Sequence, residues 1–220
     1  MFYGGDKMIV QLPEATHVHK RIPKEAFYKH LSLSGTLKSK FVSDIRDIYV
    51  EWDINAKNLR LQKVSDIKEI LFMQIELKKQ SFDNRIIETI AKENEHKLVF
   101  ILHYQNNFQL AVYYKKLYFT DWYNKDNYQL TIDGYTLNDI WNNIIKQIGL
   151  KDECLTENET TNISIDDQLK TQEKIDKLKK QITKTEKLAW KEVQPKKQFE
   201  LYKRLEKLKK DLEDLIDGEA

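Results

Sequence analysis

Glu76 and Lys78 are the residues of this chain whose types and spacing most clearly suggest chemistry. They lie near the end of residues 69–79, EILFMQIELKK, where apolar side chains recur with the two-residue period of a β-strand. One row of this strand contains the apolar residues Leu71, Met73, Ile75 and Leu77, whereas the row that holds Glu76 and Lys78 begins with Ile70 and Phe72 and ends charged. The pattern predicts a strand with one face in the core and a polar end that is either a reaction site or a solvated strand end.

A glutamate and a lysine two residues apart on one strand can serve metal-dependent hydrolysis, because a carboxylate binds Mg²⁺ and a lysine orients or activates water. This E-x-K pair, in the predicted order helix, strand, E-x-K strand, helix, strand, is similar to the nuclease superfamily named for its PD-(D/E)xK motif. The similarity implies catalytic roles for Glu76 and Lys78 and a metal site of Glu76 with Asp53 or Asp66. No Pro-Asp precedes the motif, and charged residues at a strand end are usually solvated. A Mg²⁺-dependent nuclease is therefore an alternative to a non-catalytic role, and no cofactor is expected unless it holds.

The composition indicates a folded protein without a strongly charged surface field. The chain has 220 residues, with 37 Lys and Arg against 35 Asp and Glu, so its formal net charge is only +2. Aromatic residues make up 11%, a content that disordered chains lack. Cys154 is the only cysteine, which excludes an internal disulfide and a cysteine-based zinc site. No apolar run reaches membrane-spanning length, so we expect a cytoplasmic protein that binds no membrane.

Hydrophobic periodicity over residues 1–150 predicts a mixed α/β (α+β) domain with flanking helices. A helix that begins near Asp83 separates two of the predicted strands, and such a βαβ unit has parallel strands. Thr136 and Asp139 have the spacing of a capping box, which predicts another helix that ends at Gly149. The sheet is predicted to have about five strands, at residues 48–54, 69–79, 98–102, 108–114 and 117–122.

Three histidines precede this domain core, at His17, His19 and His30, and histidine is a common metal ligand. No helix or strand spacing places the three on one face with a carboxylate. The sequence therefore predicts that they belong to a solvated basic segment that leads into the fold.

Aromatic and lysine residues alternate over residues 113–128. Such a mixture can stack bases and bind phosphates, which would make this segment a contact with DNA. An ordinary edge hairpin packed under a helix has the same composition and is the favoured interpretation. The candidate nucleic-acid contacts are Lys115, Lys116, Trp122 and Lys125.

Residues 151–164 lack apolar periodicity and predict a linker that leads to a helical region at residues 165–218. Pro195 divides that region into two arms, because proline disrupts a helix interior, and an antiparallel helical hairpin or coiled coil is predicted. The second arm repeats leucine at spacings of four and three, whereas the first has Thr185 at a core position. We therefore expect a protein partner, or a second copy of the chain, to bind the leucines Leu201, Leu205, Leu208, Leu212 and Leu215.

Three stretches of the sequence carry a family resemblance. They are VHKRIPKEAFYKHLSLSGTLKSKFVSDI, EILFMQIELKKQSFDNRIIETIAKENEHKLVFILHY and, in the hairpin, KEVQPKKQFELYKRLEKLKKDL. Together they resemble a bacterial family, the domain-of-unknown-function family 4391, from about residue 8 to the end. The resemblance implies a place beside DNA methyltransferases and helicases in restriction-modification-like, antiviral defence loci, and it implies no catalytic residues. The expected function is that of a non-catalytic adaptor subunit that binds a helicase or methyltransferase through the coiled coil.

Overall fold

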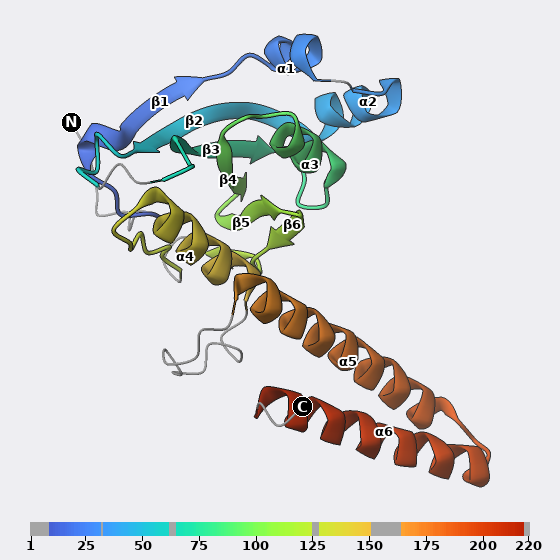
Figure 1. The fold of residues 1–220 in the computed structure, drawn as a ribbon. Helices are drawn as coiled ribbons and strands as arrows, with labels where there is room; N and C mark the ends of the chain where they lie inside the picture. The colour runs from blue at the N-terminus through green and yellow to red at the C-terminus, as the bar shows by residue number, and fades with distance from the viewer. Residues whose placement is uncertain (1–8, 32, 62–64, 125–127, 151–163, 218–220) are drawn as a thin grey trace. The chain divides into compact units, whose positions relative to one another are not determined.

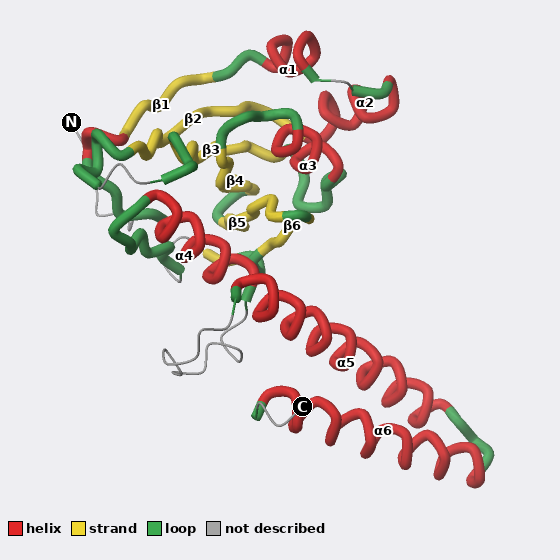
Figure 2. The backbone as a smooth tube through the Cα atoms, in the orientation of Figure 1, coloured by secondary structure: helices red, strands yellow, loops and turns green. Residues whose placement is uncertain are grey.

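The computed structural model describes residues 9–31, 33–61, 65–124, 128–150 and 164–217, and they divide into two compact units. The first unit, Met1–Gly149, contains the strands, and the second, Leu150–Ala220, contains two long helices (Figures 1 and 2). Each unit has its own hydrophobic cluster. The predicted linker lies outside the described residues except for Ser164.

A seven-stranded mixed sheet organises the first unit. Its order is β1-β2-β3-β4-β5-β6, and β7 pairs with β5. All pairs are antiparallel except β3 with β4, which confirms the predicted parallel pair. The strands are β1 (His17–Arg21), β2 (Ile45–Asn55), β3 (Glu69–Leu77), β4 (Lys97–Tyr104), β5 (Asn107–Tyr114), β6 (Lys116–Phe119) and β7 (Tyr123–Asn124).

Helices cover the two faces of this sheet. The face of β3 that carries Met73, Ile75 and Leu77 packs against residues of α1 (Lys24–His30), α2 (Gly35–Asp44) and α3 (Arg85–Lys92) in one buried cluster. The alternate side chains of the strands point to the other face, where α4 (Leu137–Gly149) contacts β3, β5 and β6. The buried stripe of α4 consists of Leu137, Ile140, Trp141, Ile144, Ile145 and Ile148.

Asp44 is a buried carboxylate at the end of α2, with 1% of the residue exposed. Its Oδ1 accepts hydrogen bonds from Lys79 Nζ at 2.8 Å and Ser43 Oγ at 2.5 Å, and its Oδ2 accepts one from the Asp83 amide at 3.0 Å. Burial by itself would raise the pKa of this carboxyl, but the hydrogen bonds from Lys79, Ser43 and the Asp83 amide outweigh it. The pKa of Asp44 therefore lies below its usual value, and the ionised side chain ties α2 to the connection between β3 and α3.

The predicted capping box begins α4 as expected. The Thr136 amide donates to Asp139 Oδ2 at 2.9 Å, and the Asp139 amide donates to Thr136 Oγ1 at 3.2 Å. Gly134 allows the chain to approach this turn closely, because its φ is +147° and a Cβ there would lie 2.7 Å from Asp139 Cβ.

Gly134→Ala should lower the free energy of unfolding by about 1–3 kcal/mol, because the added methyl group meets the α4 cap and the backbone conformation disfavours a side chain. Urea denaturation followed by circular dichroism measures this change. Gly35→Ala is the matched control, since Gly35 is the first residue of α2 and a Cβ there meets nothing within 4 Å. A Gly134→Ala protein as stable as the Gly35→Ala protein would contradict the prediction.

The second unit is the predicted antiparallel helical hairpin (Figure 1). Its helices are α5 (Ile165–Lys191) and α6 (Pro195–Ile216). Ser164 caps α5, because its Oγ accepts a hydrogen bond from the Asp167 amide at 3.2 Å, and Pro195 occupies the first turn of α6, where no amide donor is needed. Among the described residues, no helix combines the length and apolar character needed to cross a membrane.

Candidate functional site

Glu76 lies near the end of β3 in a network of polar side chains. Arg46 Nη2 lies 2.8 Å from Glu76 Oε2, and Gln74 Nε2 donates to Glu76 Oε1 at 2.9 Å. Lys78 follows the strand, and its Nζ donates to the Val42 carbonyl in the last turn of α2 at 2.8 Å. This contact supplies a donor to one of the carbonyls that a helix end leaves without an intrahelical partner. Lys78 therefore acts on the end of α2 in this structure, although it shares the strand end with Glu76.

The sheet does not bring Asp53 or Asp66 to Glu76. In the β2–β3 ladder Asp53 pairs with Leu71, five residues from Glu76 and therefore roughly 17 Å along the strand. Asp66 is exposed and lies before the opposite end of β3. The expectation that these carboxylates bridge one metal ion with Glu76 is therefore corrected, because antiparallel pairing places Asp53 at the wrong end of β2.

The carboxylate that pairs with Glu76 across the ladder is Asp47. The positively charged Arg46 side chain lies between these two carboxylates, with its guanidinium 2.8 Å from Glu76 and 3.8 Å from Asp47. Asp47 also accepts a hydrogen bond from Arg21 Nη2 at 2.5 Å. Nearby Lys24 donates to the Ile45 carbonyl at 2.6 Å, and burial, followed by the adjacent Lys78 charge, lowers the pKa of Lys24. This end of the sheet is therefore a network of charge pairs in which arginine occupies the space between the carboxylates.

Two of the candidate nucleic-acid contacts, Lys115 and Lys116, lie at the β5–β6 turn. Lys115 Nζ lies 5.4 Å from the Tyr114 ring centre, and Lys116 Nζ lies 4.9 Å from that of Tyr118, so each lysine contacts an aromatic ring of the hairpin itself. Trp122 is partly buried and packs against the main hydrophobic cluster. Lys125 lies outside the described residues. The described aromatic residues are therefore arranged as in an edge hairpin that packs on the core.

The leucine repeat of α6 faces α5. Leu205 and Leu208 are buried with Ile182 in the core of the hairpin, and Leu178 and Leu212 pack against them. Leu201 and Leu215 are half-buried. The hairpin therefore uses the centre of the repeat, Leu205 and Leu208, for its own packing, and binding of another chain by the rest of the repeat stays a prediction.

The exposed apolar side chains of the hairpin lie elsewhere, at its closed end. Five of the eight large apolar side chains that are exposed in the described residues fall between positions 188 and 202. Isolated exposed apolar residues are common, but such concentration marks interaction surfaces. We call this group the hairpin tip: Leu188, Trp190, Val193, Phe199 and Tyr202.

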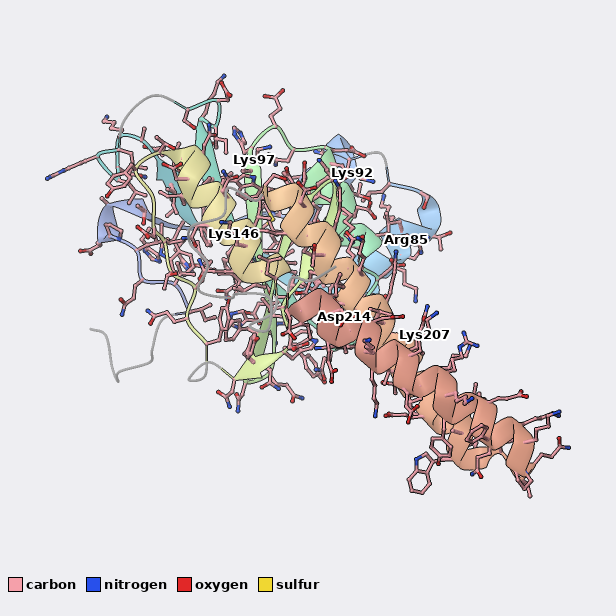
Figure 3. The ribbon with its side chains drawn as sticks, turned by 60° about the horizontal axis from the view of Figure 1, so that its bottom comes forward. Arg85, Lys92, Lys97, Lys146, Lys207 and Asp214 are labelled. Atoms are coloured by element: carbon pink, nitrogen blue, oxygen red, sulfur yellow. The ribbon has the colours of Figure 1, made fainter. Side chains whose placement is uncertain are left out.

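Positive charge surrounds the hairpin tip. Residues 187–204 contain six Lys or Arg and two Glu. Away from the tip α6 also carries charged residues of both signs, such as Lys207 and Asp214 (Figure 3). The tip therefore combines an apolar centre with a basic rim, which suits a partner surface that is apolar at its centre and acidic around it.

A group with metal-ligand chemistry lies on β1 and β2, and the sequence reasoning missed it. His19 Nδ1 lies 3.0 Å and His17 Nε2 lies 3.7 Å from Glu51 Oε2. The prediction that no spacing places these histidines on one face with a carboxylate is wrong for His17 and His19, which stand two residues apart on a strand. That two-residue spacing was the available signal, but Glu51 is 32 residues from His19 and only the β1–β2 pairing brings it near.

Comparison with known proteins identifies a family for most of the chain. The family model described as "Domain of unknown function (DUF4391)" matches residues 10–212. This range includes the sheet and nearly all of the hairpin. No curated protein and no solved structure matches the chain.

Proposed function

The chain belongs to the DUF4391 family, and we propose that it is a non-catalytic adaptor that binds another protein through its helical hairpin. The partner is a helicase or a methyltransferase of a bacterial DNA-processing system of the restriction-modification, anti-phage type. The exposed hairpin tip is the observation that carries the proposal, because Trp190 is 83% exposed and Val193 is 89% exposed.

The tip residues are large enough to supply much of the binding energy of a protein complex. Covering a large apolar side chain is worth on the order of 1.5–3 kcal/mol, and aromatic residues are frequent hot spots in interfaces. Two or three such residues contribute about 3–9 kcal/mol before the entropic cost of joining two molecules, so micromolar association also needs the charged contacts of the basic rim. Trp190 and Phe199, from α5 and α6, are the two most exposed aromatic residues of the hairpin tip and are therefore its expected anchors.

The arrangement around Glu76 also favours an adaptor over the nuclease alternative. Arg46 binds Glu76 and lies close to Asp47, so the positive charge that a Mg²⁺ ion would supply there is already provided by the protein. Lys78 donates to a main-chain carbonyl of α2. These contacts give both motif residues a structural role at the junction of α2, β2 and β3.

Trp190→Ala combined with Phe199→Ala should weaken partner binding by about a thousandfold, since each anchor lost costs about 2 kcal/mol. The measurement is co-purification from the native host at endogenous expression, with the helicase or methyltransferase quantified by mass spectrometry. Because both side chains are exposed, the melting temperature of the double variant should match that of the unchanged protein.

Tyr135→Ala is the matched control, because Tyr135 is an aromatic residue of the first unit that is 82% exposed. It should leave co-purification unchanged. Recovery of the native protein alone, as a monomer and without a DNA-processing partner, would end the adaptor proposal. So would a tip that joins only two copies of this chain, which sedimentation would detect as a concentration-dependent dimer that the double variant lacks.

A further inference from the structure

We infer that His17, His19 and Glu51 form a binding site for one divalent transition-metal cation of the Zn²⁺ class. The potential ligand atoms of the three side chains all lie within 4.8 Å of one another. They come from two strands that the chain brings together across the edge of the sheet, β1 and β2. Nothing in the proposed adaptor role uses these residues, so the site is a separate property of the protein.

The spacing of the ligand atoms fits a metal ion. Bonds of about 2.0–2.2 Å at tetrahedral angles place the ligand atoms roughly 3.3–3.5 Å apart. The separations from the carboxylate fall on either side of this value, since His19 Nδ1 lies 3.0 Å and His17 Nε2 lies 3.7 Å from Glu51 Oε2. All ligand atoms lie within 4.8 Å of one another, so shifts of at most about 1.5 Å in the exposed imidazole rings complete the coordination.

The backbone around Glu51 departs from regular pairing on both of its sides. In the β2–β3 ladder Val50 pairs with Met73 and Trp52 pairs with Phe72, which is the next residue of β3. Glu51 is therefore the extra, unpaired residue of a β-bulge in β2. The β1–β2 register also shifts, between His17 and Lys20.

His19, within that shift, has a φ of +44°, an unusual value for a residue with a side chain. The irregular backbone turns two histidines that stand two residues apart in sequence toward the same carboxylate. Their rings are nearly parallel, at an interplanar angle of 14° with centres 6.0 Å apart.

The donor set selects the class of cation. Two imidazole nitrogens and one carboxylate oxygen suit Zn²⁺, Co²⁺, Ni²⁺ and Cu²⁺, whereas Mg²⁺ and Ca²⁺ prefer oxygen ligands. The carboxylate is largely buried, with its side chain 8% exposed, and its fixed position gives the site one rigid ligand. The imidazoles are about half exposed, at 48% for His17 and 59% for His19, so an ion can enter from solvent and retain a water ligand.

Two aromatic residues of β2 stand beside the site and provide a reporter. The Tyr49 ring stacks on His19 with centres 5.3 Å apart, and the Trp52 ring lies 6.1 Å from that of His17. Such contacts restrict the imidazole rings and so reduce the entropy that ligation would cost. A paramagnetic ion bound at His17 should quench the fluorescence of Trp52.

The test is isothermal titration calorimetry on the tag-free, full-length protein. The protein is first stripped of metal with a chelator and is then titrated with ZnCl₂. One Zn²⁺ should bind per chain, and CoCl₂ should give the visible absorption of a nitrogen- and oxygen-ligated Co²⁺ ion. Loss of a hydrogen-bond partner of a metal ligand costs about 10–100-fold in affinity, so loss of a direct ligand in His17→Ala or His19→Ala should cost at least about 100-fold. Glu51→Gln should have a similar effect, and MgCl₂ should give no binding heat.

His96→Ala is the matched control, because His96 Nδ1 lies 2.8 Å from Glu69 Oε1 in an ordinary histidine–carboxylate pair. Its affinity for Zn²⁺ should equal that of the unchanged protein. In Trp52→Phe the quenching by Co²⁺ should decrease while the affinity is kept.

Glu51→Gln changes a buried polar group and could affect folding. The His17→Ala variant tests the site without this complication. His17 is half exposed and His19 remains paired with Glu51, so the variant should fold, as its thermal melt will show. Absence of stoichiometric Zn²⁺ binding, or equal Zn²⁺ affinity in His17→Ala and the unchanged protein, would overturn the inference and leave these residues as a histidine–glutamate ion pair.

Discussion

Leu205→Asp should abolish the pairing of α5 and α6. The buried core of the hairpin is small, since Leu205 and Leu208 share it with Ile182. Removing a buried leucine costs about 2–5 kcal/mol, and a carboxylate at the same position adds the cost of burying a charge without a partner. Leu205 is one of the three buried residues of this cluster, so the expected result is loss of much of the helical signal of the hairpin in circular dichroism.

Lys207→Asp provides the comparison, because Lys207 lies on the same helix at an exposed position (Figure 3). The same residue introduced there should change the free energy of unfolding by no more than about 0.5 kcal/mol. The first unit has its own core, so its near-ultraviolet signal should persist in both variants. Helical content in Leu205→Asp equal to that in Lys207→Asp would show that the leucine repeat does not hold the hairpin together.

Asp44→Ala should be the most destabilising change of a charged residue in the first unit. It removes a carboxylate that accepts hydrogen bonds from Lys79, Ser43 and the Asp83 amide, and it leaves donors in a mostly buried place without partners. Breaking a buried charge pair in this way costs about 3–5 kcal/mol, and the exposure of part of Lys79 places the expected loss near the lower value. Chemical denaturation at neutral pH measures it.

The pH dependence of this effect has a definite sign. The pKa of Asp44 is lowered in the folded protein relative to the ordinary value of 3.8. The ionised form therefore contributes stability that is fully present above the unfolded-state pKa and is lost as the pH falls through the folded-state pKa.

Asp44→Asn, which keeps the shape of the side chain, should thus differ most from the unchanged protein above about pH 5, and the difference should shrink below about pH 4. A difference that grows as the pH falls would mean that Asp44 is neutral in the folded state.

The central elements could be predicted from the sequence because their signals are local. The apolar alternation before Glu76 identified β3, and the intervening helix identified its parallel pairing with β4. Thr136 and Asp139 identified the start of α4 by spacing alone. In each case the residues that determine the structure lie within a few positions of one another.

β1 could not be predicted in the same way. All five of its residues, HVHKR, are exposed, so no alternation of apolar and polar side chains marks it as a strand. Its position depends on pairing with β2, across the intervening helices α1 and α2. The meeting of His17 and His19 with Glu51 depends on that pairing and on two register irregularities, neither of which periodicity can reveal.

The hairpin shows a different limit. The leucine repeat correctly indicated a helical seam, but periodicity does not say which surface covers it, and α5 covers Leu205 and Leu208. The hairpin tip lies where the two helices join, so its exposed residues have no helical period to mark them. Its identification required the fraction of each side chain that remains exposed.

The irregular β1 strand has a further consequence for the solubility of the protein. β1 is an edge of the seven-stranded sheet, and an edge strand can recruit a strand from another molecule and start aggregation. The register shift before Lys20 interrupts the regular row of backbone donors and acceptors, and Lys20 and Arg21 place positive charges on the same short strand. The register shift beside the histidines that meet Glu51 thus also makes this edge a poor template for intermolecular β-pairing.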